Sequence, residues 1–313
     1  MTDNAEFAPG KIAVVGAGPV GCVLAASLAN AGHEIILCDL QDDLLEPAID
    51  PGIRVHGALE VSAGVARTVA SVDELADDLP ALIFITTKAT ALPLIASAME
   101  GFHQPGTFVV SWQNGLDTER VLSDHIGSQW VMRAAVNFGV TLLAPGQVNV
   151  GFHHPPHWLQ EVHPDSRSVA AAVCDLLSDA GLPTSHAERI VDPVWQKTIL
   201  NAALGPVCAI THKTMSQALH DPFLRDLVEK LLREGINIAR ANEVQLGWDY
   251  YRYSMTYLEG AGDHKPSMLV DIENGRITEA EFINGRIAGY GEIVGLEAPY
   301  NTMMRTLVKA LES

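Results

Sequence analysis

The sequence predicts an α/β chain in two parts, a region of βαβ units with a mostly parallel sheet followed by an all-helical region. From about Lys11 to Gly139, short apolar runs alternate with segments of helical period, which is typical of βαβ units. From about Asp192 onward, nearly every segment has a helical pattern instead. We therefore expect a first domain over residues 1–187 and a helical domain over residues 188–313.

The expected elements of the first part follow from these patterns in chain order. Short apolar runs predict strands, and the segments between them include two helices. Residues 52–64 add two short β pieces around Gly57, and Pro145-Gly146 predicts the turn of a β pair that ends near residues 158–162. Ser166–Ala180 has the pattern of an amphipathic helix closed by Gly181. The predicted strands are 12–15, 34–38, 82–86, 108–111 and 131–136, and the two helices are 21–31 and 92–99.

The helices of the second part have recognisable start signals. Asp192-Pro193 and Asp221-Pro222 each place a capping carboxylate before a proline, which is favoured at the first helical position. The apolar spacing then predicts helices over about 222–242, 278–294 and 299–311.

Composition excludes several classes of protein. Hydrophobic residues make up 48% of the 313 residues, which favours a folded core over disorder. The formal net charge of −18 argues against a nucleic-acid-binding or anionic-membrane surface, but a few local cations could still bind an anionic small molecule. Residues 1–10 lack the apolar run of a signal peptide, and no apolar run is long enough to span a membrane. We expect a cytoplasmic protein.

Cysteine and histidine spacing does not favour a metal site. The four cysteines lack CxxC or zinc-finger spacing, so we expect small buried apolar side chains and a reduced compartment. The histidine-rich stretch allows either a metal site or a polar β-hairpin, and the hairpin is favoured. The residues concerned are Cys22, Cys38, Cys174 and Cys208, and His153, His154, His157 and His163.

A glycine-rich motif, G-x-G-x-x-G, follows the first predicted strand and opens the first predicted helix. Gly16 would permit a tight turn, Gly18 would let a pyrophosphate approach the backbone, and Gly21 would let the helix pack closely on the sheet. The helix N-terminus would supply N–H groups and a positive dipole for phosphates. An ordinary turn is the less favoured alternative. The motif indicates a Rossmann-type dinucleotide site made by Gly16, Ala17, Gly18, Pro19, Val20 and Gly21.

Asp39 ends the second predicted strand, where an acidic side chain can accept hydrogen bonds from a ribose 2′-OH and repel a 2′-phosphate. No arginine or lysine follows until Arg54. We therefore expect NAD(H) to be preferred over NADP(H). The alternative is a solvated aspartate with no effect on cofactor preference.

Lys197 and Asn201 form a second candidate site. They are four residues apart on the helix predicted from Pro193, so they share one face among apolar neighbours. Such a lysine could protonate a carbonyl oxygen as hydride arrives, while Asn201 holds the substrate. From spacing alone, a lysine that extends its charged end to the surface is the safer interpretation.

Five motifs occur in a fixed order along nearly the whole chain, and with them the sequence resembles the ketopantoate reductase (2-dehydropantoate 2-reductase) family. Their joint order and spacing are far more specific than any single motif. They are the glycine-rich motif, Thr87-Lys88 at a strand end, Gln113-Asn114-Gly115, Trp195-x-Lys197-x-x-x-Asn201, and Pro266-Ser267-Met268-Leu269 followed by Thr278-Glu279.

The resemblance implies a role for each matching residue. Lys197 would be the general acid, with Glu279 near it and near the cofactor ribose. Asn114 and Lys88 would line the nicotinamide–ribose side, and Ser267, with Asn201, would bind substrate. The fold implied is a dinucleotide-binding domain joined to a helical domain, with the active site between them. Each of these residues also has a simpler alternative. Lys88 could be a solvated lysine, and Asn114-Gly115 an ordinary turn pair. Ser267 could cap a helix, and Glu279 could be an acidic residue in the first turn of a helix.

The sequence departs from the family pattern at the cofactor and in the substrate pocket. The family commonly uses NADPH and often has a basic residue where this chain has Asp39. Gly205 and a position near Met215 stand where the family typically has asparagines. Fewer amides favour a bulkier or more apolar 2-oxo acid, because sites built on hydrogen bonds discriminate by them.

The leading hypothesis is therefore nicotinamide-dependent reduction of a 2-oxo acid to a 2-hydroxy acid. An NAD-dependent D-2-hydroxy-acid dehydrogenase of the mandelate type is the first alternative. A non-catalytic dinucleotide-sensing protein is a second, and a β-hydroxy-acid or opine-type dehydrogenase is a third. The partner expected is a small 2-oxo acid, without nucleic acid or membrane. The tyrosine-rich stretch 250–253 could line the cleft entrance, pack internally or contribute to a homodimer.

Overall fold

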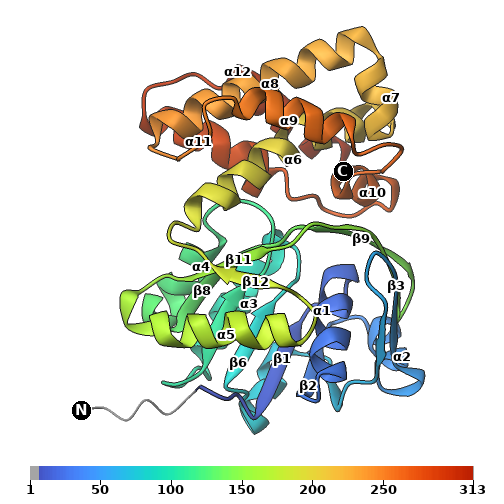
Figure 1. The fold of residues 1–313 in the computed structure, drawn as a ribbon, viewed down its shortest axis with the longest axis vertical. Helices are drawn as coiled ribbons and strands as arrows, with labels where there is room; N and C mark the ends of the chain where they lie inside the picture. The colour runs from blue at the N-terminus through green and yellow to red at the C-terminus, as the bar shows by residue number, and fades with distance from the viewer. Residues whose placement is uncertain (1–6, 313) are drawn as a thin grey trace. The chain divides into compact units, whose positions relative to one another are not determined.

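The computed structural model describes residues 7–312 and divides the chain into two compact units. The first unit contains the chain up to Thr87, residues 91–113 and residues 118–190. The second contains residues 191–313 and two short segments, Lys88–Thr90 and Asn114–Asp117. Figure 1 follows the chain from the blue and green strands of the first unit to the yellow and red helices of the second. Residues 1–6, most of the polar N-terminal stretch considered in the sequence, lie outside the described residues.

The main sheet of the first unit has eight strands, and every adjacent pair is parallel except β8 and β11. Because β2 lies on one side of β1 and β6 on the other, the winding direction reverses at β1. In open α/β sheets, ligands bind beyond the carboxyl ends of the strands at such a point. The predicted α/β class with a mostly parallel sheet is confirmed. In spatial order the strands are β12 (Thr184–His186), β11 (His157–Glu161), β8 (Val131–Ala135), β7 (Phe108–Ser111), β6 (Leu82–Ile85), β1 (Lys11–Val15), β2 (Glu34–Cys38) and β5 (Arg67–Val69).

Alternate side chains of β1 enter two different cores. Ile12 and Val14 pack with helices α1 and α5, whereas Ala13 and Val15 pack with α3 and α4. This is the two-residue period of a strand buried on both faces, which explains why each central strand is an unbroken apolar run. The helices concerned are α1 (Pro19–Asn30), α3 (Leu92–Glu100), α4 (Thr118–Ile126) and α5 (Arg167–Asp179), and a short α2 (Asp42–Pro47) follows β2.

A second sheet of four strands packs against α1. Its order is β4 (Val61–Ala63), β3 (Ile53–Gly57), β10 (Gln147–His153) and β9 (Phe138–Ala144). Helix α1 contacts strands of both sheets, and every residue from Gly21 to Leu28 is buried. A helix enclosed in this way must be apolar on all sides, as this one is.

The β pair around Pro145-Gly146 forms as predicted between β9 and β10, but its predicted end was wrong. The pair ends at His153, and residues 157–161 belong instead to β11 of the main sheet. The histidine-rich stretch is therefore divided: His153 ends β10 of the predicted hairpin, His157 begins β11 of the main sheet, and the residues between them connect the two sheets. Pro155-Pro156 lies in this connection, and prolines cannot donate to a strand ladder.

The second unit is helical, and α6 lies at its centre because five other α-helices and the η6 turn pack against it. Asp221 caps α8 as predicted, since its Oδ1 accepts hydrogen bonds from the N–H groups of Phe223 and Leu224. The helices are α6 (Val191–Thr211), α7 (Met215–His220), α8 (Pro222–Ala241), α9 (Tyr250–Glu259), α10 (Ser267–Glu273), the π-helical turn η6 (Glu281–Gly285), α11 (Arg286–Ile293) and α12 (Pro299–Leu311).

The predicted cap at Asp192 was wrong. Helix α6 begins at Val191, so Asp192 lies inside its first turn. The Asp192 carboxylate accepts instead from the backbone N–H of Gln245, 2.9 Å away. Asp192 therefore binds a backbone N–H group that is distant in the sequence, and it does not cap its own helix as the Asp-Pro pair suggested.

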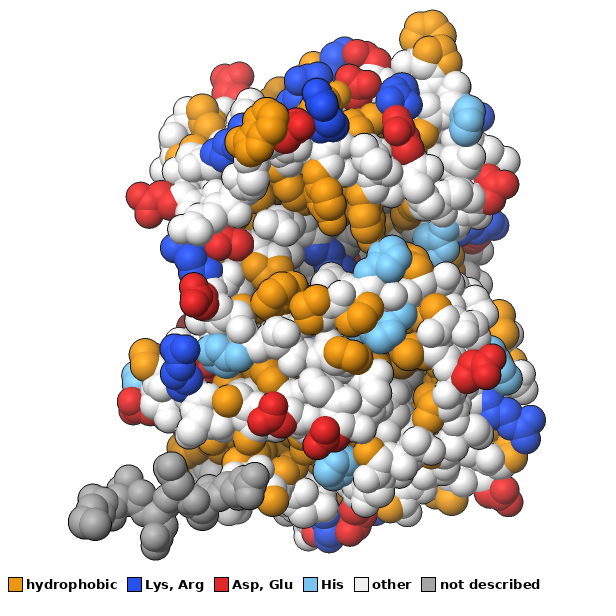
Figure 2. Space-filling model, viewed as in Figure 1, with side chains coloured by type: hydrophobic (Ala, Val, Ile, Leu, Met, Phe, Trp, Pro, Cys, Tyr) orange, Lys and Arg blue, Asp and Glu red, His pale blue; other side chains and the backbone are white. Residues whose placement is uncertain are grey.

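The surface drawn in Figure 2 mixes acidic and basic side chains, with apolar side chains between them. Within residues 7–312, none of the helices combines the length and apolar character that crossing a membrane requires.

Candidate functional site

The glycine-rich turn of the first unit joins β1 to α1. Gly16 has a φ of +110°, which favours glycine, and its N–H donates to the Cys38 carbonyl at 2.7 Å. A Cβ at Gly16 would lie 2.8 Å from the Thr87 backbone nitrogen. Conformation and space therefore both require glycine here, and Gly16 makes the tight turn that the sequence predicts.

The other two glycines differ from each other in their surroundings. A Cβ at Gly21 would lie 1.8 Å from the Gly16 carbonyl oxygen, so only glycine lets α1 pack this close to the turn. A Cβ at Gly18, by contrast, would meet nothing within 4 Å. Gly18 is the N-cap of α1 and Pro19 opens the helix. The free N–H groups of the helix N-terminus thus lie beside open space, an arrangement suited to an anion.

Asp39 is bound to the glycine-rich turn through its carboxylate. Its Oδ2 accepts the Ala17 N–H at 2.7 Å, and its Oδ1 accepts the Gln41 N–H at 3.0 Å. The acidic side chain predicted to select the cofactor therefore also fixes the backbone of the predicted phosphate-binding turn.

In the second unit, Lys88–Thr90 is held by two acidic side chains. The Lys88 ammonium forms an ion pair with Asp271 of α10, and the Ala89 N–H donates to Glu279 Oε1 at 3.0 Å. Asp271 and Glu279 are both buried. Burial raises the pKa of Asp271, and the Lys88 charge partly opposes this effect. Lys88 is thus paired, not merely solvated.

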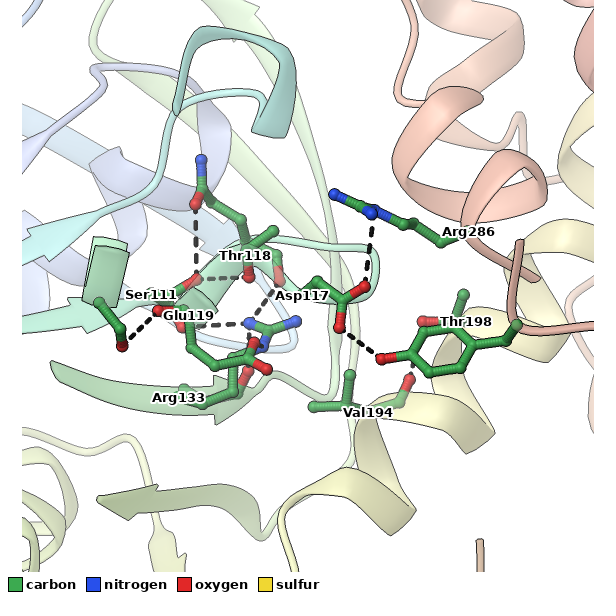
Figure 3. Close-up of polar contacts among 12 residues, drawn as sticks. Ser111, Asp117, Thr118, Glu119, Arg133, Val194, Thr198 and Arg286 are labelled. Carbon is green, nitrogen blue, oxygen red and sulfur yellow. Dashed lines mark hydrogen bonds and ion pairs between the residues drawn. The ribbon is translucent and has the colours of Figure 1, made fainter. Parts of the chain in front are cut away.

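The segment Asn114–Asp117 is held by residues 282–290. The Leu116 N–H donates to the Phe282 carbonyl at 2.9 Å, and a Cβ at Gly115 would lie 2.8 Å from that same carbonyl oxygen. The Asp117 carboxylate accepts from the Tyr290 hydroxyl at 2.6 Å and lies 3.6 Å from Arg286 Nε (Figure 3). These contacts fix the residues next to Asn114, which is itself partly exposed.

Lys197 and Asn201 lie one turn apart on α6 and are both partly exposed. Two residues before Lys197, the Trp195 ring is buried and packs edge-on against Tyr290, with 5.1 Å between ring centroids. The predicted shared face for Lys197 and Asn201 is confirmed, because the helix is continuous from Val191 to Thr211.

A proline inside α6 requires a compensating side chain beside Asn201. Pro206 has no N–H, so the Ala202 carbonyl lacks its usual helical donor four residues on. The fully buried Asn284 donates its Nδ2 to that carbonyl at 3.0 Å and to Asn301 Oδ1 at 2.9 Å. Asn284 was not identified from the sequence, although a proline inside a helix was a signal that such a donor is needed.

Two further predicted residues, Ser267 and Gly205, lie at the contact between α10 and α6. Ser267 is the first residue of α10 and is exposed, and the N-cap position belongs to Pro266. A Cβ at Gly205 would lie 3.8 Å from the Cβ of Met268, an ordinary contact. Gly205 is therefore required neither by its conformation nor by close packing.

Glu279 is held indirectly through its neighbour Thr278. The N–H and the hydroxyl of Thr278 both donate to Glu312 Oε1, at 2.9 and 2.6 Å. Glu279 precedes η6 and is not in the first turn of a helix. No local pattern in the sequence indicates Glu312 as the partner of Thr278, because the two residues lie 34 positions apart.

Cysteines and histidines form no metal cluster within the described part of the chain. The four cysteines are buried and free, and burial raises the pKa of each thiol to about 12, so they remain protonated at neutral pH. His157 is also buried, and its Nδ1 accepts the Asn137 N–H.

Comparisons with known proteins cover both units. The family model described as "Ketopantoate reductase PanE/ApbA" matches residues 12–162, and "Ketopantoate reductase PanE/ApbA C terminal" matches residues 189–312. A 2-dehydropantoate 2-reductase of Pyrococcus horikoshii is 29% identical over 304 residues, covering 97% of this chain and 98% of the relative. The Streptococcus pyogenes serotype M3 protein of that name is 28% identical over 307 residues, covering 96% and 97%.

A solved structure of D-mandelate dehydrogenase with NADH and anilino(oxo)acetate is also similar. It has a TM-score of 0.86 and 25% sequence identity, and the match covers 96% of this chain and 98% of that one. The two family models together span the glycine-rich turn, α6 and Glu279.

Proposed function

Because the chain belongs to the ketopantoate reductase family, we propose that it reduces a 2-oxo acid to a 2-hydroxy acid with a nicotinamide dinucleotide as hydride donor. One observation carries the proposal. The chain combines a glycine-rich turn built for a dinucleotide with Lys197 and Asn201 on one face of α6. A protein that only bound the dinucleotide would not need the second feature.

The glycine-rich turn and Asp39 would hold the dinucleotide. The space beside Gly18 and the free N–H groups at the start of α1 suit a pyrophosphate. The Asp39 carboxylate is anchored by Ala17 and Gln41 and would accept hydrogen bonds from the adenine ribose. It would also repel a 2′-phosphate, which supports NADH over NADPH as the preferred cofactor.

Lys197 would act as the general acid. A nicotinamide dinucleotide, when bound, would supply the hydride that reaches the C2 carbonyl carbon of the substrate. Negative charge then develops on the carbonyl oxygen, where a protonated Lys197 stabilises it and donates a proton from Nζ. In the reverse direction the neutral amine takes that proton back. Asn201, one turn along the same helix face, would hold the substrate in place.

Glu279 and Asn114 would complete the site. The buried Glu279 carboxylate uses Oε1 to hold the Ala89 N–H, and its other oxygen would accept from the cofactor ribose or from Lys197. Asn114 is partly exposed beside the anchored Gly115 and Leu116, so its amide would face the nicotinamide ribose. Ser267, exposed at the start of α10, would bind the substrate carboxylate.

The substrate class has two candidates. The named relatives favour ketopantoate. A more apolar 2-oxo acid, as in a mandelate-type dehydrogenase, is favoured by Gly205, which has no side chain to offer a hydrogen bond and packs beside the apolar Met268. Ketopantoate and phenylglyoxylate, assayed side by side with NADH, separate these candidates by their kcat/KM.

The proposal is tested by Lys197→Ala, with Lys230→Ala as the control. Lys230 is an exposed lysine of α8 that pairs with Asp226, so its replacement removes the same charge from the helical unit. Loss of the general acid should lower kcat by about 10²- to 10⁴-fold. NADH affinity, measured by direct titration, should stay close to that of the wild type.

Near-normal turnover in Lys197→Ala would refute the assignment of the general acid. A wild-type protein that binds NADH but turns over no member of a broad 2-oxo acid panel would instead be a dinucleotide sensor.

A further inference from the structure

Arg133 is a charged residue inside the main sheet. It lies on β8, is only 2% exposed, and is flanked along the strand by buried residues. Charged side chains are almost never this deeply buried without specific partners, because leaving water costs free energy. The question is therefore which groups need a buried guanidinium at this place.

Arg133 binds three backbone carbonyl oxygens, two at or just beyond the end of β7 and one on β8 itself. Its Nη1 donates to the carbonyls of Ser111 at 3.1 Å, Gln113 at 2.9 Å and Ala134 at 2.7 Å. Its Nε lies 3.3 Å from Glu119 Oε2 of α4, which supplies the opposite charge. Figure 3 shows Ser111, Thr118 and Glu119 gathered around the guanidinium.

The geometry of the strands explains why the carbonyls need this donor. Strand β7 ends at Ser111, which is paired in register with Arg133 itself. The Gln113 carbonyl lies beyond the ladder in a buried position, so no strand neighbour can supply a donor. Arg133 reaches over the end of the strand and takes that place.

The same network extends to the neighbouring strand end. Gln113 Nε2 donates to the Thr87 carbonyl at 2.9 Å, beyond the end of β6. The chain Arg133–Gln113–Thr87 thus fixes two peptide groups, Gln113–Asn114 and Thr87–Lys88. Asn114 and Lys88, which follow these two peptide groups, begin the two short segments that belong to the second unit.

We propose that Arg133 is a positioning residue for the nicotinamide end of the dinucleotide, acting through the Gln113–Asn114 and Thr87–Lys88 peptide groups. The proposal rests on the function proposed above, in which Asn114 and Lys88 line the nicotinamide ribose. The adenine end depends on other residues, the glycine-rich turn and Asp39, which none of the Arg133 contacts above involves. Loss of the guanidinium should therefore weaken one end of the cofactor selectively.

The test compares NADH with ADP, which lacks both the nicotinamide ring and the ribose that carries it. Calorimetric titration of the folded protein gives both dissociation constants for the wild type and for Arg133→Met. We expect NADH to bind about tenfold more weakly to the variant, while the affinity for ADP changes by less than about twofold. Arg133→Lys should give intermediate NADH affinity, because its ammonium keeps the charge and three donors on one nitrogen.

Leu177→Ala provides the control for lost stability. Leu177 is fully buried in α5 and belongs to the core shared with β1, so its truncation should lower the melting temperature. Leu177→Ala should leave the ratio of the two dissociation constants unchanged. If Arg133 had only a structural role, Arg133→Met would leave that ratio unchanged as well. An unchanged ratio in folded Arg133→Met would overturn the proposal.

If Arg133→Met does not fold, Gln113→Leu carries the same test, because it removes the hydrogen bond to the Thr87 carbonyl and keeps Arg133. A wild-type ratio in that variant would likewise refute the network. A wild-type protein that binds neither NADH nor ADP would refute the proposed function itself. The two failures are therefore distinguishable.

Discussion

Replacing Asp39 with asparagine tests whether this side chain both shapes the predicted phosphate-binding turn and selects the cofactor. In the native protein, each carboxylate oxygen accepts one backbone N–H, from Ala17 at 2.7 Å and from Gln41 at 3.0 Å. Asparagine offers one carbonyl oxygen and one NH₂ group. One of the two N–H groups would therefore face another donor, although the shape of the side chain is nearly unchanged.

The magnitude follows from the hydrogen bond that the charged Asp39 carboxylate is proposed to accept from the adenine ribose, because the bonds from Ala17 and Gln41 are already present in the free protein. A hydrogen bond to a charged group contributes about 1.5–3 kcal/mol. Because about 1.4 kcal/mol corresponds to a tenfold change in an equilibrium constant, NADH affinity should fall by about 10- to 100-fold. Removing the negative charge should also relieve the repulsion of a 2′-phosphate. The ratio of kcat/KM for NADH to that for NADPH should then fall by at least about tenfold.

The assay is steady-state kinetics with both cofactors, together with calorimetric titration of NADH. Asp42→Asn is the matched control. Asp42 is an exposed acidic residue in the first turn of α2, so this substitution removes the same charge at a position close to Asp39. Equal cofactor ratios for Asp39→Asn and Asp42→Asn would refute the reasoning. A wild-type preference for NADPH would refute the proposed cofactor choice directly.

Two further outcomes follow from contacts in the helical unit. Gly205→Asn should fold normally, because the new Cβ would lie 3.8 Å from Met268. The added amide should raise kcat/KM for ketopantoate relative to that for phenylglyoxylate. If the ratio of the two kcat/KM values does not change, Gly205 does not determine substrate specificity. Glu312→Gln should lower the melting temperature at pH 7, because hydrogen bonds from Lys309 and Thr278, although opposed by burial, leave the pKa of Glu312 below its usual range. A carboxylate whose pKa is lower in the folded than in the unfolded protein stabilises the fold above the unfolded-state pKa, and this stabilisation is lost as the pH falls through the folded-state pKa. The difference in melting temperature between Glu312→Gln and the wild type should therefore disappear at acidic pH. A difference in melting temperature that persists in acid would contradict the argument.

The glycine-rich turn could be predicted from the sequence because its determinants are local. A tight turn, a helix start and a close helix-to-turn contact all arise within the few residues from Gly16 to Gly21. The strands of the main sheet were equally accessible, since strands buried on both faces are unbroken apolar runs. Lys197 and Asn201 could be placed on one face for the same reason, as helical spacing is local.

The separate second sheet could not be predicted in this way. Strand β3 pairs with β10, and the paired residues Arg54 and Gln147 lie far apart in the sequence. The sequence patterns predicted both strands, but they did not indicate that these two strands pair with each other. The residues after Pro155-Pro156 were therefore placed in the wrong sheet.

The supporting residues of the site were hidden for a related reason. Arg133, Asp271 and Glu312 act on segments distant in sequence, and their partners are often backbone groups. Backbone carbonyls and N–H groups are present at every position, so the sequence does not indicate which of them will need a side-chain partner. Such contacts appear only when the fold brings the segments together.

The burial of α1 between two sheets restricts how cofactor preference could be altered by protein engineering. Residues 21–28 have no solvent-facing side, so a library that varies this helix would mostly yield unfolded protein. The residues after β2 differ, because Leu40, Gln41, Asp42 and Asp43 are all exposed. Mutational tolerance should therefore change abruptly between these two neighbouring segments, and directed evolution toward another cofactor should accumulate its substitutions at Asp39 and from Leu40 to Asp43.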